Sequence, residues 1–218
     1  MAKPIEIIKS LAKRGPIAVI CTLLIGVTIA FWSGFYSGSG RKPAPGSFHD
    51  MIVNHPHDLS GLITPKDGRI RALASDLKTP QNAFSFVRDR IEFDPSSAAL
   101  PAGDVLTQGR ASCLGKAVLL CSLYRAMGLS SAEVRVVTGE VESPYGAIDH
   151  AWVEMEYDGT CIQQDATSLL GSFGFDQFKG KEYTSSFIHR ELSVFNDTHF
   201  AIVSQLNLLQ MRGHPPVE

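Results

Sequence analysis

The sequence contains few cysteines, little net charge and no stripe of basic residues, and each absence excludes a class of protein. Four cysteines in 218 residues are too few for the disulfide scaffold of a small secreted domain. The formal net charge of −2 gives no indication of a surface for nucleic acid, so no nucleic-acid partner is expected. No internal repeat is present, and the length favours one domain with appendages.

The cysteines are also poorly placed for cross-links or metal binding. Cys113 and Cys121 fall on one expected helix, roughly 12 Å apart along its axis, which is too far for a disulfide. A bridge between Cys121 and Cys161 is left open as an alternative. Cys113 and His150 have no further ligands at the short spacing of zinc sites, so neither a metal nor a cofactor is expected.

Charge is absent from residues 16–36, and this run determines the expected location of the protein. The run is mostly apolar, has aromatic residues at its far end, and reaches the length of about 20 residues that a helix needs to cross a bilayer. Residues 1–15 are basic, which places them in the cytoplasm. We therefore expect a single-pass protein of the inner membrane, with its soluble domain in the periplasm or outside the cell. A signal peptide that is cut within residues 37–40 and gives a secreted protein is the alternative.

The rest of the chain divides into a linker and a domain. Residues 37–66 are rich in Gly, Ser and Pro near their start and show little periodicity, as is typical of a tether. Residues 67–210 carry periodic apolar patterns and are expected to form the folded domain. The patterns predict helices at 69–78, 80–93 and 113–127, a loop at 95–108, strands at 134–138, 151–157 and 160–165, and a strand or short helix at 200–209.

The helix predicted at 113–127 is apolar over most of its circumference, which indicates a buried central helix. Ser112 supplies an N-cap, and Gly128 supplies a C-terminal stop. Because helices precede strands along the chain, the sequence predicts an α+β domain in which this helix packs on an antiparallel sheet. The nearby charged residues are expected to be solvated or paired: Arg110, Lys116 and Arg125.

Three residues have the types and positions that thiol chemistry requires. Cys113 begins the central helix, where free N–H groups and the helix dipole favour the thiolate. His150 begins one strand, and Asp165 ends the next. Each alone has an ordinary structural explanation, as a small core residue, a satisfied histidine and a solvated charge. Together, in this order, they fit a nucleophile, a general base and acid, and a residue that orients the base.

The turn between the two strands connects His150 with Asp165. The dipeptide Asp158-Gly159 is a strong signal for a two-residue hairpin turn. Counting back from that turn puts His150 and Asp165 on one face of the sheet as diagonal neighbours, about 7–8 Å apart at the backbone. Their side chains can close that gap to a hydrogen bond. Trp152 is expected to pack beside them.

Four segments resemble the transglutaminase-like superfamily, in order and at suitable spacings. They are GRASCLGKAVLLCSLYRAMG at 109–128, AEVRVVTG at 132–139, DHAWVE at 149–154 and QDAT at 164–167. The resemblance covers about residues 80–170. It implies a papain-like fold and a Cys–His–Asp triad that acts on amides, carried here by Cys113, His150 and Asp165.

A thioester at Cys113 has two fates. Water would make the protein a cysteine peptidase or amidase, and an amine would make it a cross-linking transglutaminase. We expect hydrolysis, with a protein or peptide of the cell envelope as substrate, and a non-catalytic envelope binding module of the same fold is the rival hypothesis. The backbone N–H of Cys113 is a natural oxyanion donor, and Gln108 is a candidate second donor, with an ordinary loop glutamine as the alternative.

Overall fold

The fold comes from a computed structural model that describes residues 50–51, 54–143, 146–167 and 169–203. All of these residues belong to one compact unit, Lys42–Glu218. The expected basic segment at 1–15, the expected membrane-spanning helix at 16–36 and the start of the expected linker lie outside the described residues. Within the described ranges, none of the helices has the length and apolar character that crossing a bilayer requires.

Helices come first along the described chain, and strands dominate its second half. The helical elements are η1 (Pro56–Asp58), α4 (Leu59–Leu62), α5 (Gly68–Leu77), α6 (Pro80–Arg90), α7 (Ala102–Gln108), α8 (Cys113–Ala126) and α9 (Glu182–Phe187). The strands are β1 (Glu92–Phe93), β2 (Arg110–Ala111), β3 (Val134–Ser143), β4 (Gly146–Tyr157), β5 (Thr160–Gln164), β6 (Phe178–Lys179), β7 (Ile188–Phe195) and β8 (Phe200–Ile202).

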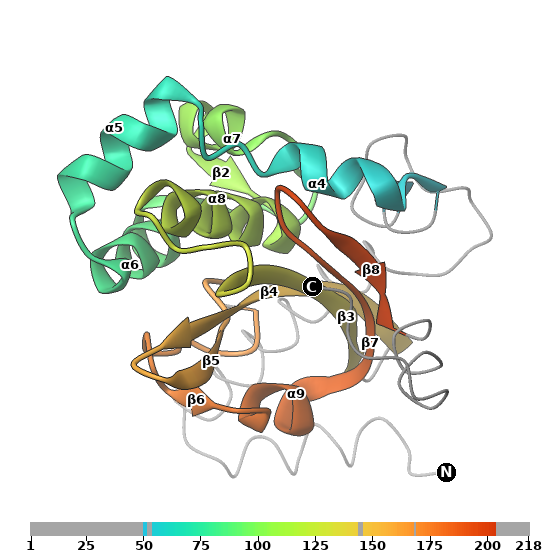
Figure 1. Cartoon of the computed structure of the whole chain (residues 1–218). Coiled ribbons are helices and arrows are strands. Elements are labelled where there is room, and N and C mark those ends of the chain that lie inside the picture. The colour runs from blue at the N-terminus through green and yellow to red at the C-terminus, as the bar shows by residue number, and fades with distance from the viewer. Residues whose placement is uncertain (1–49, 52–53, 144–145, 168, 204–218) are drawn as a thin grey trace, which may run out of the picture. The chain divides into compact units, whose positions relative to one another are not determined.

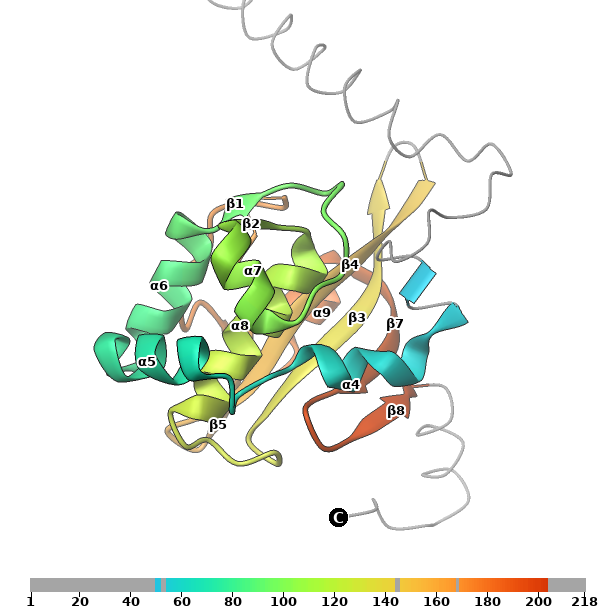
Figure 2. The same cartoon turned by 90° about the horizontal axis from the view of Figure 1, so that it is seen from above.

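Six of the described strands form a sheet in the order β6-β5-β4-β3-β7-β8, in which every neighbouring pair is antiparallel. Helices α5, α6, α7 and α8 gather on one side of this sheet, and α9 lies on the other (Figure 1). Seen from above, α8 runs beside β4 (Figure 2). This arrangement is the mixed helix-and-sheet fold with an antiparallel sheet that a papain-like core requires, so the coarse fold prediction is confirmed.

Helix α8 is the centre of the helical layer. It contacts β3 and β4 on the sheet and α5, α6 and α7 around it. Ser112 caps its start by accepting a hydrogen bond from the Gly115 N–H at 3.4 Å. Twelve consecutive residues from Cys113 to Tyr124 are buried, as the apolar circumference of this segment predicts. Since each fully buried large apolar side chain contributes about 1.5–3 kcal/mol, burial of this helix contributes strongly to the stability of the core.

Lys116 is the exception to the expectation for the charged residues near α8. Its side chain is 2% exposed, so the expectation of a solvated or ion-paired charge is wrong. The amino group instead donates to the carbonyl oxygens of Arg88 at 3.1 Å and Ile91 at 2.8 Å, at the end of α6. Burial lowers the pKa of Lys116 to about 8, although the Asp165 carboxylate works in the opposite direction. Burial of the lysine is tolerated because its donors close the open carbonyls of a helix end.

The hairpin between β4 and β5 has the predicted register. Tyr157 pairs with Thr160, and the pairing continues to Val153 opposite Gln164. Asp158 and Gly159 have positive φ values of 50° and 71°, as the expected two-residue turn requires. The turn chemistry of the sequence therefore fixed which residues of the two strands share a face.

Several predicted boundaries were wrong. The helix expected at 80–93 ends at Arg90, and residues 92–93 pair instead with β2 in a two-stranded parallel ribbon. The loop expected at 95–108 contains α7. The tether expected at 37–66 contains η1 and α4, and Leu59 of α4 is fully buried in the core. The packed domain therefore begins before residue 67. At the other end, β8 accounts for part of the element expected at 200–209, and residues from 204 onward lie outside the described residues.

Candidate functional site

Cys113 is the first residue of α8 and is nearly buried, with 6% of its surface exposed. Its position at the helix start puts the sulfur near the unsatisfied backbone N–H groups and the positive end of the helix dipole. The three cysteines that the structure describes, Cys113, Cys121 and Cys161, are all free. The bridge that was left open between Cys121 and Cys161 is therefore not formed.

His150 lies on β4 opposite Gly139 of β3 and is fully buried. On its other side, β5 pairs with β4 only from Val153 to Tyr157, so this pairing ends before His150 is reached. The end of β5 leaves room for the residue that follows it, Asp165. The Nε2 atom of His150 lies 3.1 Å from Oδ2 of Asp165, so the hairpin joins the two side chains as its register predicts.

Asp165 is fully buried immediately after β5. Its Oδ1 accepts a hydrogen bond from the Thr167 N–H at 2.8 Å, and its Oδ2 faces the His150 ring. A buried carboxylate is costly unless it is paired and hydrogen-bonded. Here burial raises the pKa of Asp165, but the charge of His150 and the hydrogen bonds from His150 and Thr167 outweigh burial, so the pKa is lowered.

Tyr183 of α9 also belongs to this cluster, and no sequence pattern predicts it there. Its hydroxyl donates to Asp165 Oδ2 at 2.8 Å and lies 2.9 Å from His150 Nε2. Burial, together with the nearby carboxylate, raises its pKa well above the usual value, so the hydroxyl keeps its proton. In the sequence, Tyr183 is one of several aromatic residues after residue 170, and no turn or strand pattern links that segment to His150.

The ring of His150 carries a raised pKa. Burial lowers this pKa, but the charge of Asp165 and its hydrogen bond raise it more, and the nearby Cys113 thiol acts in the same direction. Within the described part of the chain, Nδ1 of the ring has no hydrogen-bond partner. Nε2 is occupied by Asp165 and Tyr183, so Nδ1 is the nitrogen available to the thiol.

Gln108 is the last residue of α7, and its side chain is exposed. Among the described residues, no hydrogen bond joins it to Cys113 or His150. Its role as an oxyanion donor stays a prediction, as do the assigned roles of the other three residues. The first turn of α8 has free backbone N–H groups at Cys113. These groups can stabilise a developing negative charge without a side chain from a second residue.

Trp152 packs beside the site, as expected. Its side chain is fully buried, and its ring stacks on that of His150 at a centroid distance of 6.5 Å and an interplanar angle of 21°. On its other sides it meets Tyr183, and the far edge of its indole lies over Gly139. The ring thus limits how far His150 can rotate.

Within the described ranges, no group of three or more His, Cys, Asp or Glu side chains is arranged to hold a metal ion. A thiol, an imidazole that is bound through one ring nitrogen and free at the other, and a carboxylate that holds the imidazole are the groups that acyl transfer through a thioester uses.

Comparison with known proteins gives one match to a family and several to solved structures. No curated protein sequence matches the chain significantly. Among solved structures, calcium-bound LapG of Legionella pneumophila is 15% identical, over 72% of this chain and 98% of that chain, with a TM-score of 0.45. Another structure of LapG is 14% identical, over 72% and 92% of the two chains, with a TM-score of 0.44. A protein of Cytophaga hutchinsonii, described as a candidate cysteine protease, is 19% identical over 69% of this chain and 56% of that chain, with a TM-score of 0.40.

Each of these structural likenesses has a TM-score below 0.5, so the family assignment rests on the sequence match. Residues 67–165 match the model of the transglutaminase-like superfamily. The matched segment begins just before α5 and ends at Asp165, so it contains Cys113, His150 and the carboxylate that holds His150. Residues 67–165 therefore carry a domain of the transglutaminase-like superfamily.

Proposed function

We propose that the protein is a thiol-dependent acyl-transfer enzyme that acts on amide bonds, with Cys113 as nucleophile, His150 as general base and acid, and Asp165 as the orienting residue. One observation carries this proposal. The buried ring of His150 is bound at Nε2 and unpartnered at Nδ1, and the nearby Cys113 thiol adds to the rise in its pKa that Asp165 causes. A purely structural histidine in a core would have both ring nitrogens satisfied.

The proposed first step transfers the Cys113 proton to Nδ1 of His150 and joins the sulfur to the carbonyl carbon of an amide. The carbonyl oxygen becomes an oxyanion, which the backbone N–H at the start of α8 stabilises. The imidazolium then gives its proton to the leaving amine as the carbon–nitrogen bond breaks, and a thioester is left on Cys113. Asp165 remains ionised throughout and holds the charged ring.

In the second step, a water molecule attacks the thioester while His150 takes its proton, and the acid product leaves with the thiol restored. We favour this hydrolytic outcome, which makes the protein a cysteine peptidase or amidase. An amine in place of water gives an amide cross-link by the same route, as in a transglutaminase. Both outcomes use the same three residues, so the acceptor molecule distinguishes them.

The proposed location is the inner membrane, with residues 16–36 as a single anchor and the domain outside the cytoplasm. This part of the proposal rests on the long uncharged run and its basic flank. The substrate would then be a protein or peptide of the cell envelope. Cleavage of the N-terminal segment, which would release the domain, is the alternative outcome. Fractionation of cells into membrane and soluble parts, followed by detection of the intact chain, distinguishes the two.

The test of the reaction uses fluorescently labelled casein as a general amide substrate, with and without cadaverine as an amine. Hydrolysis predicts small labelled fragments in both mixtures, and cross-linking predicts cadaverine joined to intact casein. Cys113→Ala should abolish either product, whereas Cys161→Ala, a matched loss of a half-buried thiol on β5, should leave it unchanged. Turnover that survives in Cys113→Ala contradicts the assignment.

A binding module with the same fold predicts a different result from a small thiol reagent. If Cys113 is paired with His150 as proposed, iodoacetamide should alkylate it near neutral pH in the folded protein, although its exposed fraction is only 6%. Mass spectrometry of the digested protein locates the modified cysteine. Absence of modification at Cys113, in protein that is modified at Cys161, would favour the binding module.

A further inference from the structure

Three polar atoms meet in one buried triangle that the proposed mechanism does not fully use. Tyr183 Oη lies 2.8 Å from Asp165 Oδ2 and 2.9 Å from His150 Nε2, and the third side, from Nε2 to Oδ2, is 3.1 Å. All three residues are fully buried. Because buried polar groups must satisfy one another, the protons in this triangle can be counted.

The tyrosine hydroxyl has one proton to donate, and Asp165 is held ionised, so it has none. The short contact between Tyr183 and the carboxylate therefore requires the tyrosine proton to point at Oδ2. Tyr183 Oη can then only accept on the side that faces His150. Both contacts of Nε2 are thus to acceptors, and Nε2 must carry a proton in every state of the ring. A neutral His150 consequently has its free lone pair at Nδ1, the nitrogen proposed to take the Cys113 proton.

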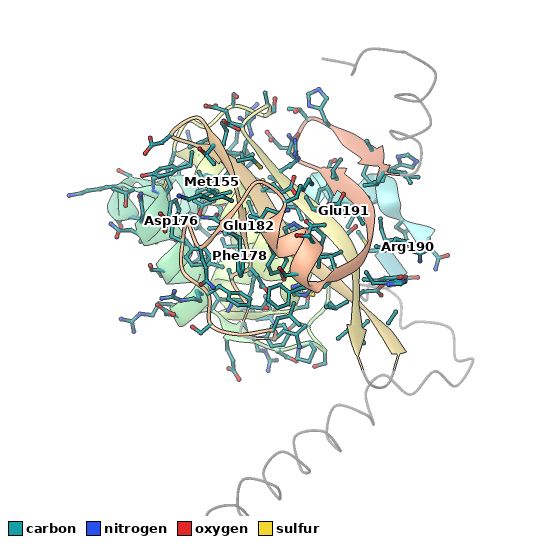
Figure 3. The ribbon with its side chains drawn as sticks, turned by 90° about the horizontal axis from the view of Figure 1, so that it is seen from below. Met155, Asp176, Phe178, Glu182, Arg190 and Glu191 are labelled. Atoms are coloured by element: carbon teal, nitrogen blue, oxygen red, sulfur yellow. The ribbon has the colours of Figure 1, made fainter. Side chains whose placement is uncertain are left out.

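The Tyr183 hydroxyl is held in place because α9 is attached to the face of the sheet opposite α8. Figure 3 shows the molecule from that side. Just before α9, the amino group of Lys181 contacts the buried carboxylate of Glu154 at 2.8 Å. Inside the helix, the Thr184 N–H donates to Gln163 Oε1 at 3.1 Å. These two contacts lie on either side of Tyr183 in the sequence, so they fix both the position and the rotation of the helix turn that carries it.

The aromatic ring of Tyr183 is fixed independently of its hydroxyl. It packs against Trp152, Phe178 and Phe187 at centroid distances of 5.7, 5.3 and 5.3 Å. Replacement by phenylalanine therefore keeps this packing and removes only the oxygen. The hydrogen-bonding role can be separated from the packing role in a single substitution.

We propose that Tyr183 is a positioning residue for the acyl-transfer reaction, acting through Asp165 and His150 and not on the substrate. Its hydroxyl shares the negative charge of Asp165 Oδ2 with His150 and supplies a second acceptor for the Nε2 proton. The inference rests on the proposed function for its catalytic meaning, but the triangle itself can be measured without any turnover.

Removal of the hydroxyl changes the balance on Asp165 in a defined direction. Oδ2 loses a charge-assisted hydrogen bond, so the carboxylate becomes a stronger base and attracts the Nε2 proton more strongly. The stronger attraction of Asp165 for the charged ring outweighs the loss of the weaker hydrogen bond from the Nε2 N–H to the neutral Tyr183 oxygen. The pH at which His150 loses its extra proton should therefore rise in Tyr183→Phe, by about one pH unit.

The experiment is nitrogen-15 NMR of histidine-labelled full-length chain in a Cys113→Ala background, in which His150 titrates without a coupled thiol. The ring is followed across pH in this protein, in the same protein with Tyr183→Phe, and in a matched control with Tyr157→Phe. Tyr157 also has a hydrogen-bonded hydroxyl, which accepts from Gln81, but Asp165 is not its partner. The control should titrate like the background protein.

Two results support the proposal together: a neutral ring protonated at Nε2 in the background protein, and a higher titration midpoint in Tyr183→Phe alone. A neutral ring protonated at Nδ1 overturns it, and so does a midpoint that is unchanged or lowered in Tyr183→Phe. The tautomer is measured with Tyr183 in place, so the proposal stays refutable even if the phenylalanine variant does not fold. Failure of casein turnover would refute the proposed function without altering these ring measurements.

Discussion

Gly139 faces His150 across β3 and β4, and the fold leaves no room there for even one additional carbon. A Cβ at this position would lie 2.6 Å from the Arg190 carbonyl oxygen and 3.0 Å from the indole of Trp152. The crowding arises because the register between β3 and β7 shifts on both sides of this stretch, which brings the β7 backbone unusually close. The substitution Gly139→Ala therefore tests the packing behind His150 directly.

The size of the effect follows from the overlap. Carbon and carbonyl oxygen ordinarily approach to about 3.3 Å, so the backbone of β7 or β3 must move by more than half an ångström. Overpacking of this kind costs about 1–3 kcal/mol, and replacement of glycine by alanine returns about 0.4–1 kcal/mol by restricting the unfolded chain. The free energy of unfolding should therefore fall by about 1–2 kcal/mol.

Urea unfolding measures this loss, and a decrease of the midpoint on the order of 0.5–1 M is expected. Because the displaced Trp152 stacks on His150, the rate of Cys113 alkylation by iodoacetamide should also fall several-fold. Gly174→Ala is the matched control, since a Cβ there meets only Gln177 at 3.8 Å, an ordinary contact. A Gly139→Ala protein with the midpoint and alkylation rate of the wild type would refute the packing argument.

Three further changes probe other parts of the fold. Cys113→Ala should abolish casein turnover and change the free energy of unfolding by less than about 1 kcal/mol, because alanine suits a helix; a large loss of stability in urea would contradict this. Burial lowers the pKa of Lys116 to about 8, so between there and its ordinary value of 10.5 the unfolded chain binds this proton and the folded chain does not. The free energy of unfolding of the wild type should accordingly rise relative to Lys116→Met from pH 8 to pH 10, and urea curves that stay equally spaced would count against it. Gly159→Ala forces alanine to a φ of 71°, so the free energy of unfolding measured in urea should fall by about 1–2 kcal/mol. The rate of Cys113 alkylation should stay unchanged, and a stability equal to that of the wild type would argue against the hairpin turn.

Much of the candidate site was predictable because it depends on local patterns. The cap at Ser112 and the apolar circumference after it fixed where α8 starts, and so placed Cys113 at a helix N-terminus. The two-residue turn fixed the register of β4 and β5, and period-two alternation then put His150 and Asp165 on one face. Turn chemistry and strand alternation act over a few residues, so both can be read from the sequence alone.

The errors fall where local patterns are weak and distant contacts prevail. Helix α7 lies in a stretch rich in Ala, Pro and Gly, yet Ala102 and Val105 become buried in the core. Lys116 reads as a surface charge, but the carbonyls at the end of α6, more than twenty residues earlier, accept its protons. In both cases the stabilisation comes from packing and hydrogen bonds that exist only once the chain has folded.

The sequence by itself determined the helix that begins at Cys113, the hairpin, and the order of Cys113, His150 and Asp165. Only the tertiary structure brought Tyr183 to His150, because α9 reaches that face of the sheet through contacts with β4 and β5 that no short-range pattern encodes. Periodicity and turn types are properties of neighbouring residues. The protonation state of a buried ring depends on every group around it, and those groups come from segments that meet only after folding.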